Sequence, residues 1–389
     1  MRLTTALFAL AALVGTASSR ILLVGSETIS ATTDDPVGIS IYRTDAAGKL
    51  TKIGQETIAT TGNQPTYFAL SNNHKFLYVT NEVELGTLTA FRVSRNNPNN
   101  CKNVSNNEVD DNEVTSNDDK LSLEFLGTTA TNTKGPVHVM LTNDNKYALV
   151  PSYSDGAVVV FKLNEDGTVG EIVDKVQFTG AAGHVAWSQD GPRAHCVAMS
   201  KDNSYVYVTD LGNDKIMQFK LNDEGKLIEN GFVDTGRSTL PRHLAVHPNG
   251  VDIFLTTEFS NELVRYEVQS DGQLVKKAAV KTSENTGKQF ASAVHVTKDG
   301  KFVLVSNRGL EGNENNIVVF DAATLKRVST GSLRADAYPR DFTISDDNIV
   351  YVGNQRTSDL VSFHLRKDGT LVHTGTNVTV PKPVVLLTL

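Results

Sequence analysis

The chain has 389 residues, 39% of them hydrophobic, which provides a large buried core and excludes a mainly disordered protein. Its formal net charge of −7 and pI of about 5.7 exclude a nucleic-acid partner, because no basic field is available to displace counterions from phosphate.

Residues 1–19 predict a secretory signal peptide. Arg2 precedes an apolar stretch from Ala6 to Val14, and the small residues Ala17 and Ser19 follow it. This stretch is too short to cross a membrane, and no later run approaches that length. We therefore expect a mature chain without membrane contact that is secreted to the extracellular space. The alternative is a buried N-terminal strand or helix.

Export would permit glycosylation and disulfide formation. Two sequons begin at Asn103 and Asn377, so we expect a glycoprotein. The two cysteines, Cys101 and Cys196, are too few for a disulfide framework, and the sequence leaves open whether they pair. They lack the Cys-x-x-Cys spacing typical of a metal site, so we predict none.

One layout recurs along the chain: a short strand, a tight turn rich in Asn, Asp and Gly, and a second strand with β-branched and aromatic residues. A second hairpin follows most copies, as in VVVFKLNEDGTV and IMQFKLNDEGKL, so each unit has four strands. Corresponding positions are separated by roughly 45 to 70 residues, as expected of propeller blades with insertions. These positions are Tyr67, His138, His195, His243, His295 and Asp341.

The two ends of the chain complete a seventh unit. The segments ILLVGSE and GISIYRTDAAGKL supply most of it, and the C-terminal PVVLLTL supplies the missing strand. We predict an all-β fold, a single seven-bladed β-propeller over residues 20–389, closed by pairing of the N- and C-terminal strands. The segment from about 95 to 120 is rich in Asn and Asp and does not fit the repeat, so we predict a mobile insertion there.

Polar residues at the ends of the inner hairpins predict a site at one mouth of the central channel. The start of the first strand and the end of the second share an edge, because the turn lies at the other. Several Arg, a Glu and a His in one concavity indicate an anion-binding site, since buried unpaired charge is costly. The alternative is that these side chains hydrogen-bond the blades to one another. The edge residues are His195 with Asp210, Arg242 and His243 with Glu258, His295 with Asn307 and Arg308, and Arg340 with Asn354.

The motifs RAH, PRHLAVHPNG, TTEFSNEL and AVHVTKDGKFVLVSNRG, with NQPTYFAL near the N-terminus, resemble the lactonase family of seven-bladed propellers. This family contains bacterial 6-phosphogluconolactonases and fungal 3-carboxy-cis,cis-muconate lactonizing enzymes. The resemblance runs from about residue 21 to the end and implies an enzyme without metal or cofactor. The family's proposed active-site groups fall here on His195, Arg242, Glu258 and Arg308.

Three positions depart from the family pattern. Its usual His-x-His is here Arg193-Ala194-His195, a frequent Glu is here Ala293, and an Ala-Asn-Tyr triplet is here Pro151-Ser152-Tyr153. These departures leave the substrate open.

We therefore expect a metal-independent lactonase that acts as a monomer on a small-molecule lactone or carboxylate. Glu258 or His195 would transfer the proton, and Arg242 and Arg308 would hold the substrate anion, with His243 and Arg193 as further substrate-binding residues. The signal peptide argues against the cytosolic role of a 6-phosphogluconolactonase and favours an extracellular lactone.

Two alternatives stay open. The same residues could serve a carboxymuconate cyclase, which adds a carboxylate across a double bond. A non-catalytic secreted propeller that binds a protein or glycan is also compatible, because the YVTN of FLYVTNE marks propeller repeats in surface proteins.

Overall fold

The computed structural model describes residues 20–29, 31, 33–96, 120–180, 183–284 and 288–389. The predicted signal peptide, Cys101, Asn103 and most of the predicted insertion lie outside the described residues. In the described part of the chain, no helix is both long and apolar enough to cross a membrane.

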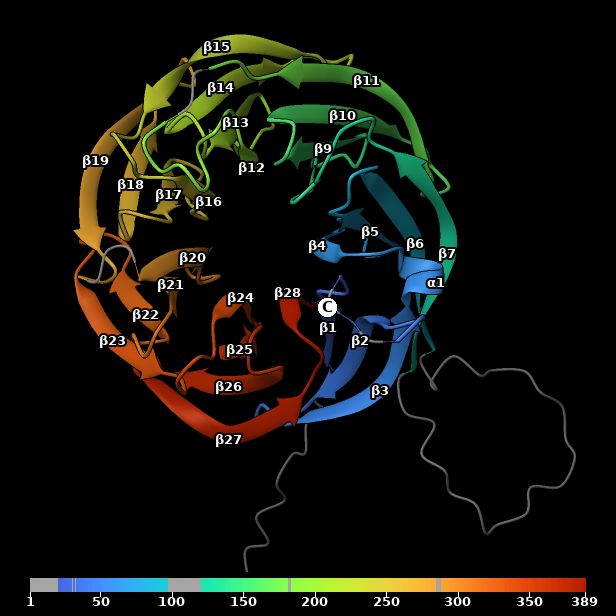
Figure 1. Ribbon diagram of the computed structural model, residues 1–389, viewed down its shortest axis with the longest axis vertical. Helices are drawn as coiled ribbons and strands as arrows, with labels where there is room; N and C mark the ends of the chain where they lie inside the picture. Colours follow the sequence, from blue (N-terminus) through green and yellow to red (C-terminus); the bar gives the residue numbers. More distant parts are fainter. Residues whose placement is uncertain (1–19, 30, 32, 97–119, 181–182, 285–287) are drawn as a thin grey trace, which may run out of the picture.

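Seven four-stranded antiparallel sheets stand as blades around a central channel (Figure 1). Within each blade the strands are given from the channel outward. The first four blades are β28 (Pro383–Thr388), β1 (Arg20–Ser26), β2 (Val37–Thr44), β3 (Leu50–Thr57); β4 (Pro65–Leu70), β5 (Phe76–Asn81), β6 (Thr87–Asn96), β7 (Lys120–Ala130); β8 (Met140–Leu141), β9 (Tyr147–Ser152), β10 (Ala157–Leu163), β11 (Val169–Gln177); and β12 (Ala194–Met199), β13 (Tyr205–Asp210), β14 (Lys215–Leu221), β15 (Leu227–Asp234).

The remaining three blades follow the same order. They are β16 (Pro241–Val246), β17 (Asp252–Thr257), β18 (Glu262–Val268), β19 (Leu274–Lys281); β20 (Gln289–Val296), β21 (Phe302–Gly309), β22 (Asn316–Asp321), β23 (Arg327–Ser332); and β24 (Pro339–Ile344), β25 (Ile349–Asn354), β26 (Asp359–Leu365), β27 (Leu371–Thr379). A single helical turn, α1 (Ile58–Thr61), joins the first blade to the second.

The two ends of the chain close the ring, as predicted. β28 pairs antiparallel with β1 through Leu22 with Thr388, Leu23 with Leu387 and Val24 with Leu386. The last strand of the chain is therefore the innermost strand of the first blade (Figure 1). The predicted all-β, seven-bladed fold is confirmed.

The core lies between the blades rather than inside any one of them. Residues of neighbouring blades share a cluster, as Tyr207 of β13 does with Leu244 of β16 and Leu255 of β17. The second strand of a blade is almost wholly buried, as in β17 and β25, whereas the outermost strand β3 has a single buried position. Stacked blades thus provide the hydrophobic surface that no blade could bury alone.

Two segments differ from the sequence prediction. In the third blade, the predicted first strand shrinks to the two residues of β8, preceded by an isolated bridge between Pro136 and Ser152. One further backbone bond lies between the bridge and β8, from the N–H of Val137 to the carbonyl oxygen of Pro151 at 3.1 Å. The ends of the predicted insertion are strand instead, because Arg95 pairs with Leu121 and Asn96 pairs with Lys120.

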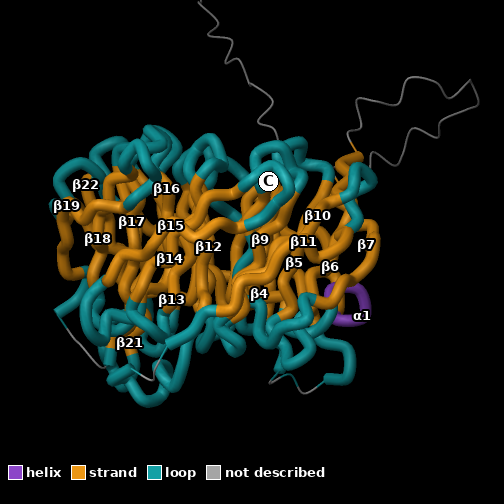
Figure 2. The backbone as a smooth tube through the Cα atoms, turned by 90° about the horizontal axis from the view of Figure 1, so that it is seen from above, coloured by secondary structure: helices purple, strands orange, loops and turns teal. Residues whose placement is uncertain are grey.

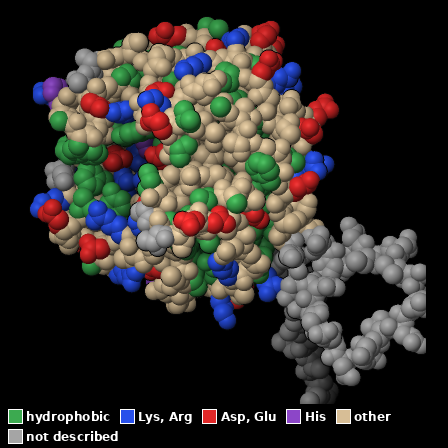
Figure 3. Space-filling model, turned by 45° about the vertical axis from the view of Figure 1, so that its right-hand side comes forward, with side chains coloured by type: hydrophobic (Ala, Val, Ile, Leu, Met, Phe, Trp, Pro, Cys, Tyr) green, Lys and Arg blue, Asp and Glu red, His purple; other side chains and the backbone are tan. Residues whose placement is uncertain are grey.

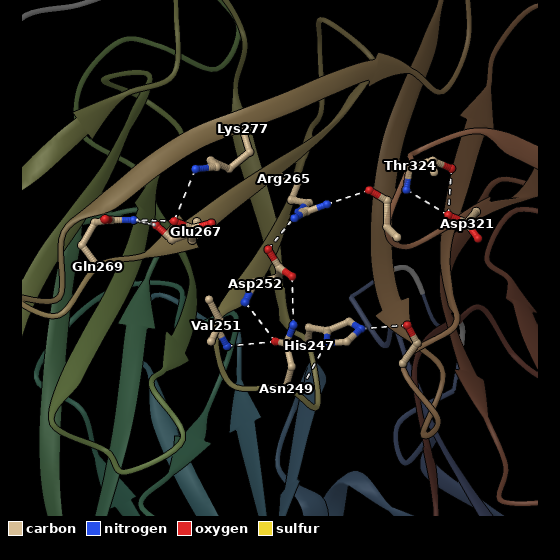
Figure 4. A network of polar contacts seen from close by, with 12 residues as sticks. His247, Asn249, Val251, Asp252, Arg265, Glu267, Gln269, Lys277, Asp321 and Thr324 are labelled. Atoms are coloured by element: carbon tan, nitrogen blue, oxygen red, sulfur yellow. Dashed lines mark hydrogen bonds and ion pairs between the residues drawn. The ribbon is translucent and has the colours of Figure 1, made fainter.

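Polar side chains also tie neighbouring blades together (Figure 4). Arg265 of β18 donates from Nε to Asp252 Oδ1 at 2.8 Å and from Nη1 to the carbonyl oxygen of Ala323 in the next blade at 2.6 Å. His247 Nε2 lies 2.7 Å from the carbonyl oxygen of Gly300, also in the next blade. These contacts give His247 a structural role.

Seen edge-on, the ring has loops at both ends of its strands (Figure 2). Each innermost strand begins, and its neighbour ends, on the side where α1 lies, which we call the site face. The tight turns between these two strands lie on the opposite side, which we call the turn face.

Candidate active site

Three charged residues predicted from the sequence meet at the site-face mouth of the channel. Glu258 follows β17, and its Oε2 lies 3.0 Å from Arg242 Nε of β16 and 3.1 Å from Arg308 Nη2 of β21. The two arginine side chains are only 3% and 4% exposed, whereas that of Glu258 is 14% exposed. One carboxylate is thus shared by two buried guanidinium groups from neighbouring blades.

A short loop fixes the positions of Arg242 and Glu258. Leu240 has a left-handed backbone, with φ at 55°, and Pro241 then starts β16. The Asp214 carboxylate accepts backbone N–H groups from Ser238 at 2.7 Å and from Thr239 and Leu240, each at 2.9 Å. A left-handed leucine is strained, so this loop persists only because its neighbours hold it.

The site has more positive charge than its carboxylate balances. Arg242 Nη1 and Arg308 Nε are buried and find no hydrogen-bond acceptor among the described residues. Burial and the nearby charge of Arg308 lower the pKa of Arg242 to about 9, which leaves it protonated at neutral pH. Burial acts to lower the pKa of Arg308, but the charge and hydrogen bond of Glu258, together with Tyr338 and Tyr153, outweigh it and the pKa is raised. Buried donors with spare capacity and excess positive charge make this mouth an anion-binding site.

Aromatic rings and imidazoles fill the channel below these charges. Tyr67 and His138 lie 3.9 Å apart between ring centroids, His138 and His243 lie 6.1 Å apart, and His195 and His243 lie 5.2 Å apart. Burial and the charge of Arg242 lower the pKa of His138 to about 3, and they hold the pKa values of His195 and His243 well below the usual range. All three imidazoles are therefore neutral at pH 7.

This layer lies between the charged mouth and a second space. On the turn face, the channel forms a cavity of about 510 Å³ whose polar lining includes Tyr67, His138, His243 and His295. His295 Nε2 lies 3.4 Å from Asp341 Oδ1, and the other oxygen of Asp341 accepts the backbone N–H of Leu386 at 3.0 Å.

Arg193 takes a different position from the other predicted residues. Its guanidinium pairs with Asp190, donates to the carbonyl oxygen of Ser154 at 2.8 Å and lies 5.2 Å from the ring centroid of Tyr153. It therefore holds the segment just before β12. Its Nε has no partner among the described residues, so a substrate contact stays a prediction.

Glu82 and Arg340 form a second charged pair that the sequence interpretation did not single out together. Arg340 Nη2 lies 3.8 Å from Glu82 Oε2, and burial raises the pKa of Glu82 despite that positive neighbour. Glu82 follows β5 as Glu258 follows β17. The backbone N–H of Glu82 donates to the carbonyl oxygen of Gln64 at 3.0 Å, and that of Glu258 donates to the carbonyl oxygen of Leu240 at 2.7 Å. Both acceptors are left-handed residues that precede a proline. Aligning TNE with TTE in the repeats would have revealed this equivalence.

The surface is hollowed where this mouth opens, and basic, acidic and hydrophobic side chains line the hollow (Figure 3). Across the described residues, no group of three or more His, Cys, Asp or Glu side chains is placed to hold a metal ion. Cys196 is a buried free thiol in β12, and burial raises its pKa to about 12, so it is unreactive.

Comparison with known proteins places the chain in a family. The family model described as lactonase, 7-bladed beta-propeller, matches residues 21–118 and 102–388. A 6-phosphogluconolactonase of Bacillus subtilis is 29% identical over 360 residues, covering 89% of this chain and 93% of the relative. A 6-phosphogluconolactonase of Formosa agariphila is 27% identical over 337 residues, covering 82% and 85%.

Solved structures agree with this match. A periplasmic gluconolactonase of Pseudomonas aeruginosa superposes with a TM-score of 0.79 at 25% identity, covering 96% of this chain and 99% of its own. A structure from Bacteroides fragilis has a TM-score of 0.80 at 23% identity, covering 96% and 99%, and supports the fold. The family model spans nearly all of the described propeller, and the chain therefore belongs to the lactonase family of seven-bladed β-propellers.

Proposed function

We propose that this protein hydrolyses a small anionic lactone at the site-face mouth of its channel. The observation that carries the proposal is the single Glu258 carboxylate shared by Arg242 and Arg308, both buried and both with unused N–H donors. The names of the relatives support the reaction class, because they describe lactonases of phosphorylated or free gluconic acid.

Lactone hydrolysis needs a base for the attacking water and positive charge for the developing oxyanion. Glu258 is the base in our assignment: it takes a proton from water as the water oxygen bonds to the carbonyl carbon. The bond between that carbon and the ring oxygen then breaks, and the ring oxygen takes the proton back from Glu258. Arg242 and Arg308 bind the substrate anion and stabilise the oxyanion, since planar guanidinium groups suit both.

His195 and Glu82 are the candidates for a second proton-transfer group. His195 is neutral at pH 7, so it can relay a proton but cannot act as an imidazolium acid in the free enzyme. Glu82 has a raised pKa, which favours a proton donor. The positive charge of Arg242 acts to lower the pKa of both groups, so a change at the anion site would alter their protonation.

The reaction as proposed is independent of metal. The imidazoles nearest the charged mouth are arranged around Arg242, whose positive charge disfavours a bound divalent cation. A guanidinium pair already supplies the charge stabilisation that a metal would otherwise provide.

The proposal includes export, on the strength of the N-terminal apolar segment, and glycosylation, on the strength of the sequons. Asn377 of the second sequon is exposed on the outer strand β27, where a glycan has room. N-terminal sequencing of the secreted protein, together with its mass before and after glycosidase treatment, tests both parts.

The activity test is hydrolysis of glucono-δ-lactone, 6-phosphogluconolactone and a muconolactone by the mature protein in EDTA. We expect turnover of at least one lactone to survive the chelator, and Glu258→Gln and Arg242→Ala to lower it by at least about 100-fold. Glu267→Gln and Arg265→Ala are matched controls, because they remove the same groups from the polar network of the β18 region (Figure 4) and leave the channel mouth intact.

Equal activity in the site variants and the wild type would overturn the assignment of the residues. No wild-type turnover of any lactone would overturn the hydrolase and favour the two alternatives. A muconate substrate would then test the cyclase, and failure there would leave a propeller that binds a protein or glycan.

A further inference from the structure

The only tryptophan of the chain is exposed shortly before β12. Trp187 is 60% exposed in the segment between β11 and β12. Gln189 Oε1 accepts the backbone N–H groups of His184 and Val185, each at 3.0 Å, and Ser188 Oγ lies 2.8 Å from the hydroxyl of Tyr153. Residues on both sides of Trp187 are therefore held by specific hydrogen bonds, while the indole itself faces solvent.

The same loop is also anchored by apolar packing. Val185 is buried with Leu211 and Leu240, and Tyr153 and Phe259 pack against this cluster. Leu240 belongs to the left-handed turn that positions Arg242. The loop with Trp187 and the loop before Arg242 thus share one small core, which fixes the indole relative to the charged mouth.

Two phenylalanines connect Trp187 to the anion site. Its ring lies 6.4 Å from that of Phe259 and 5.8 Å from that of Phe290, the latter in an edge-to-face arrangement at 81°. Phe259 directly follows Glu258, and Phe290 of β20 is the cross-strand partner of Arg308. Cross-strand partners point to the same side of a sheet, so Phe290 and Arg308 are neighbours.

We name Trp187, Phe259 and Phe290 the aromatic lip. Phe290 is buried and Phe259 is half-buried, whereas Trp187 presents its apolar surface to solvent. Exposed aromatic surface beside a concave polar site is typical of ligand-binding surfaces. Hydrophobic side chains gather at one edge of the hollow in Figure 3, next to the basic and acidic groups.

We propose that the aromatic lip is a subsite for an apolar face of the substrate. The preferred lactone then has two parts: an anionic group, which binds Arg242 and Arg308, and a hydrophobic substituent, which stacks on Trp187. This inference rests on the proposed function, because it uses the same anion site, and it selects lactones with an aryl or alkyl group over fully hydroxylated ones.

Binding of two phosphates with the same charge tests the subsite directly. Phenyl phosphate and methyl phosphate differ only in the apolar group, so calorimetry on the mature protein isolates the contribution of the lip. We expect phenyl phosphate to bind about tenfold more tightly. Trp187→Ala should abolish that preference without changing the affinity for methyl phosphate, and Trp187→Phe should restore part of it.

Two further measurements separate a substrate contact from a general effect on folding. Because the chain has one tryptophan, phenyl phosphate should change the intrinsic fluorescence of the wild type at the concentrations that saturate the calorimetric signal. With a hydrolysed lactone that has an aryl substituent, Trp187→Ala should raise KM about tenfold and change kcat by less than about threefold. Ile228→Ala, on the outer strand β15 and 52% exposed, is the matched control and should change neither.

The outcomes distinguish the two proposals. Equal affinities for the two phosphates in the wild type, or an unchanged preference in Trp187→Ala, would overturn the subsite while lactone hydrolysis stands. If neither phosphate binds and no lactone is hydrolysed, the anion site itself is wrong and the subsite proposal fails with it.

Discussion

The backbone N–H of Glu258 donates to the carbonyl oxygen of Leu240 at 2.7 Å. This bond joins the end of β17 to the residue two positions before Arg242, so the base and one of its guanidinium partners are held by a single local connection. The geometry of the charged mouth therefore depends on the turn around Leu240 as well as on the charged residues themselves.

The first prediction concerns the Asp214 carboxylate, which holds that turn through three backbone N–H groups. Asp214→Asn keeps a residue that tolerates the left-handed backbone but weakens these charge-assisted bonds, so we expect kcat/KM to fall about tenfold. Asp202→Asn removes a similar turn-holding carboxylate on the turn face and should leave kcat/KM unchanged. A loss of the same size in both variants would contradict a positioning role for Asp214.

The second prediction concerns charge balance at the mouth. Glu258→Gln removes the carboxylate that Arg242 and Arg308 share, so inorganic phosphate should bind about tenfold more tightly while catalysis is lost. The same variant should be less stable than the wild type, and phosphate should raise its Tm more than it raises that of the wild type. The control is Glu262→Gln on β18, which removes the ion-pair partner of Lys281 on β19 and should not change the affinity for phosphate. An unchanged affinity in Glu258→Gln would mean that Glu258 does not limit anion binding.

The third prediction is a loss of stability in mild acid. His138, His195 and His243 have pKa values below the ordinary 6.5 in the folded protein, so at pH below about 6.5 the unfolded chain takes up protons that the folded chain does not. The contribution of these histidines to the free energy of unfolding is therefore fully present above that pH. It is lost as the pH drops, by up to about 1.4 kcal/mol per pH unit for each histidine.

Urea unfolding at about pH 7.5, about pH 6 and about pH 5, which bracket the ordinary pKa of histidine, measures this slope. His138→Phe keeps an aromatic ring beside Tyr67 and should remove about a third of the slope. Val139→Ala lowers stability at every pH through lost burial and should leave the slope unchanged. A slope equal to that of the wild type in His138→Phe would refute the contribution of this imidazole.

The fourth prediction concerns closure of the ring. Leu386 of β28 is 4% exposed and packs with Tyr351 and Leu360 of the neighbouring blade. Leu386→Ala should lower the free energy of unfolding by about 2–5 kcal/mol, because it leaves a cavity at the closing strand. Thr388→Ala, two residues later, should cost less than about 0.5 kcal/mol. Similar small losses in both variants would mean that closure contributes little to stability.

The repeat pattern was sufficient to predict the fold because each blade carries the same hairpin signals, from NQPTYFAL to PRDFTISDD. It also predicted that Arg242, Glu258 and Arg308 would meet, since residues at equivalent strand ends share one face of a ring. The rule that located them treats every blade alike, and for this reason it could not distinguish Arg193, which turns toward Asp190 and Ser154.

Other parts of the site follow from contacts between distant segments and are not visible in the repeat pattern. Trp187 lies in an irregular loop outside the repeat, so no periodicity relates it to Phe290, about 100 residues away along the chain. The short β8 was equally out of reach, because PVHVMLTN carries the same strand signals as PTYFALSN, yet only Met140 and Leu141 form a strand there.

The pairing of Leu22 with Thr388 has a consequence for the order of folding. Contacts between residues so far apart in sequence are the slowest to form, because a long segment must be ordered before they are gained. During synthesis, six blades can acquire all their strands in turn, but the blade that contains β1 must wait until β28 has been made. The blade that contains β1 is therefore expected to be the last of the seven to be completed.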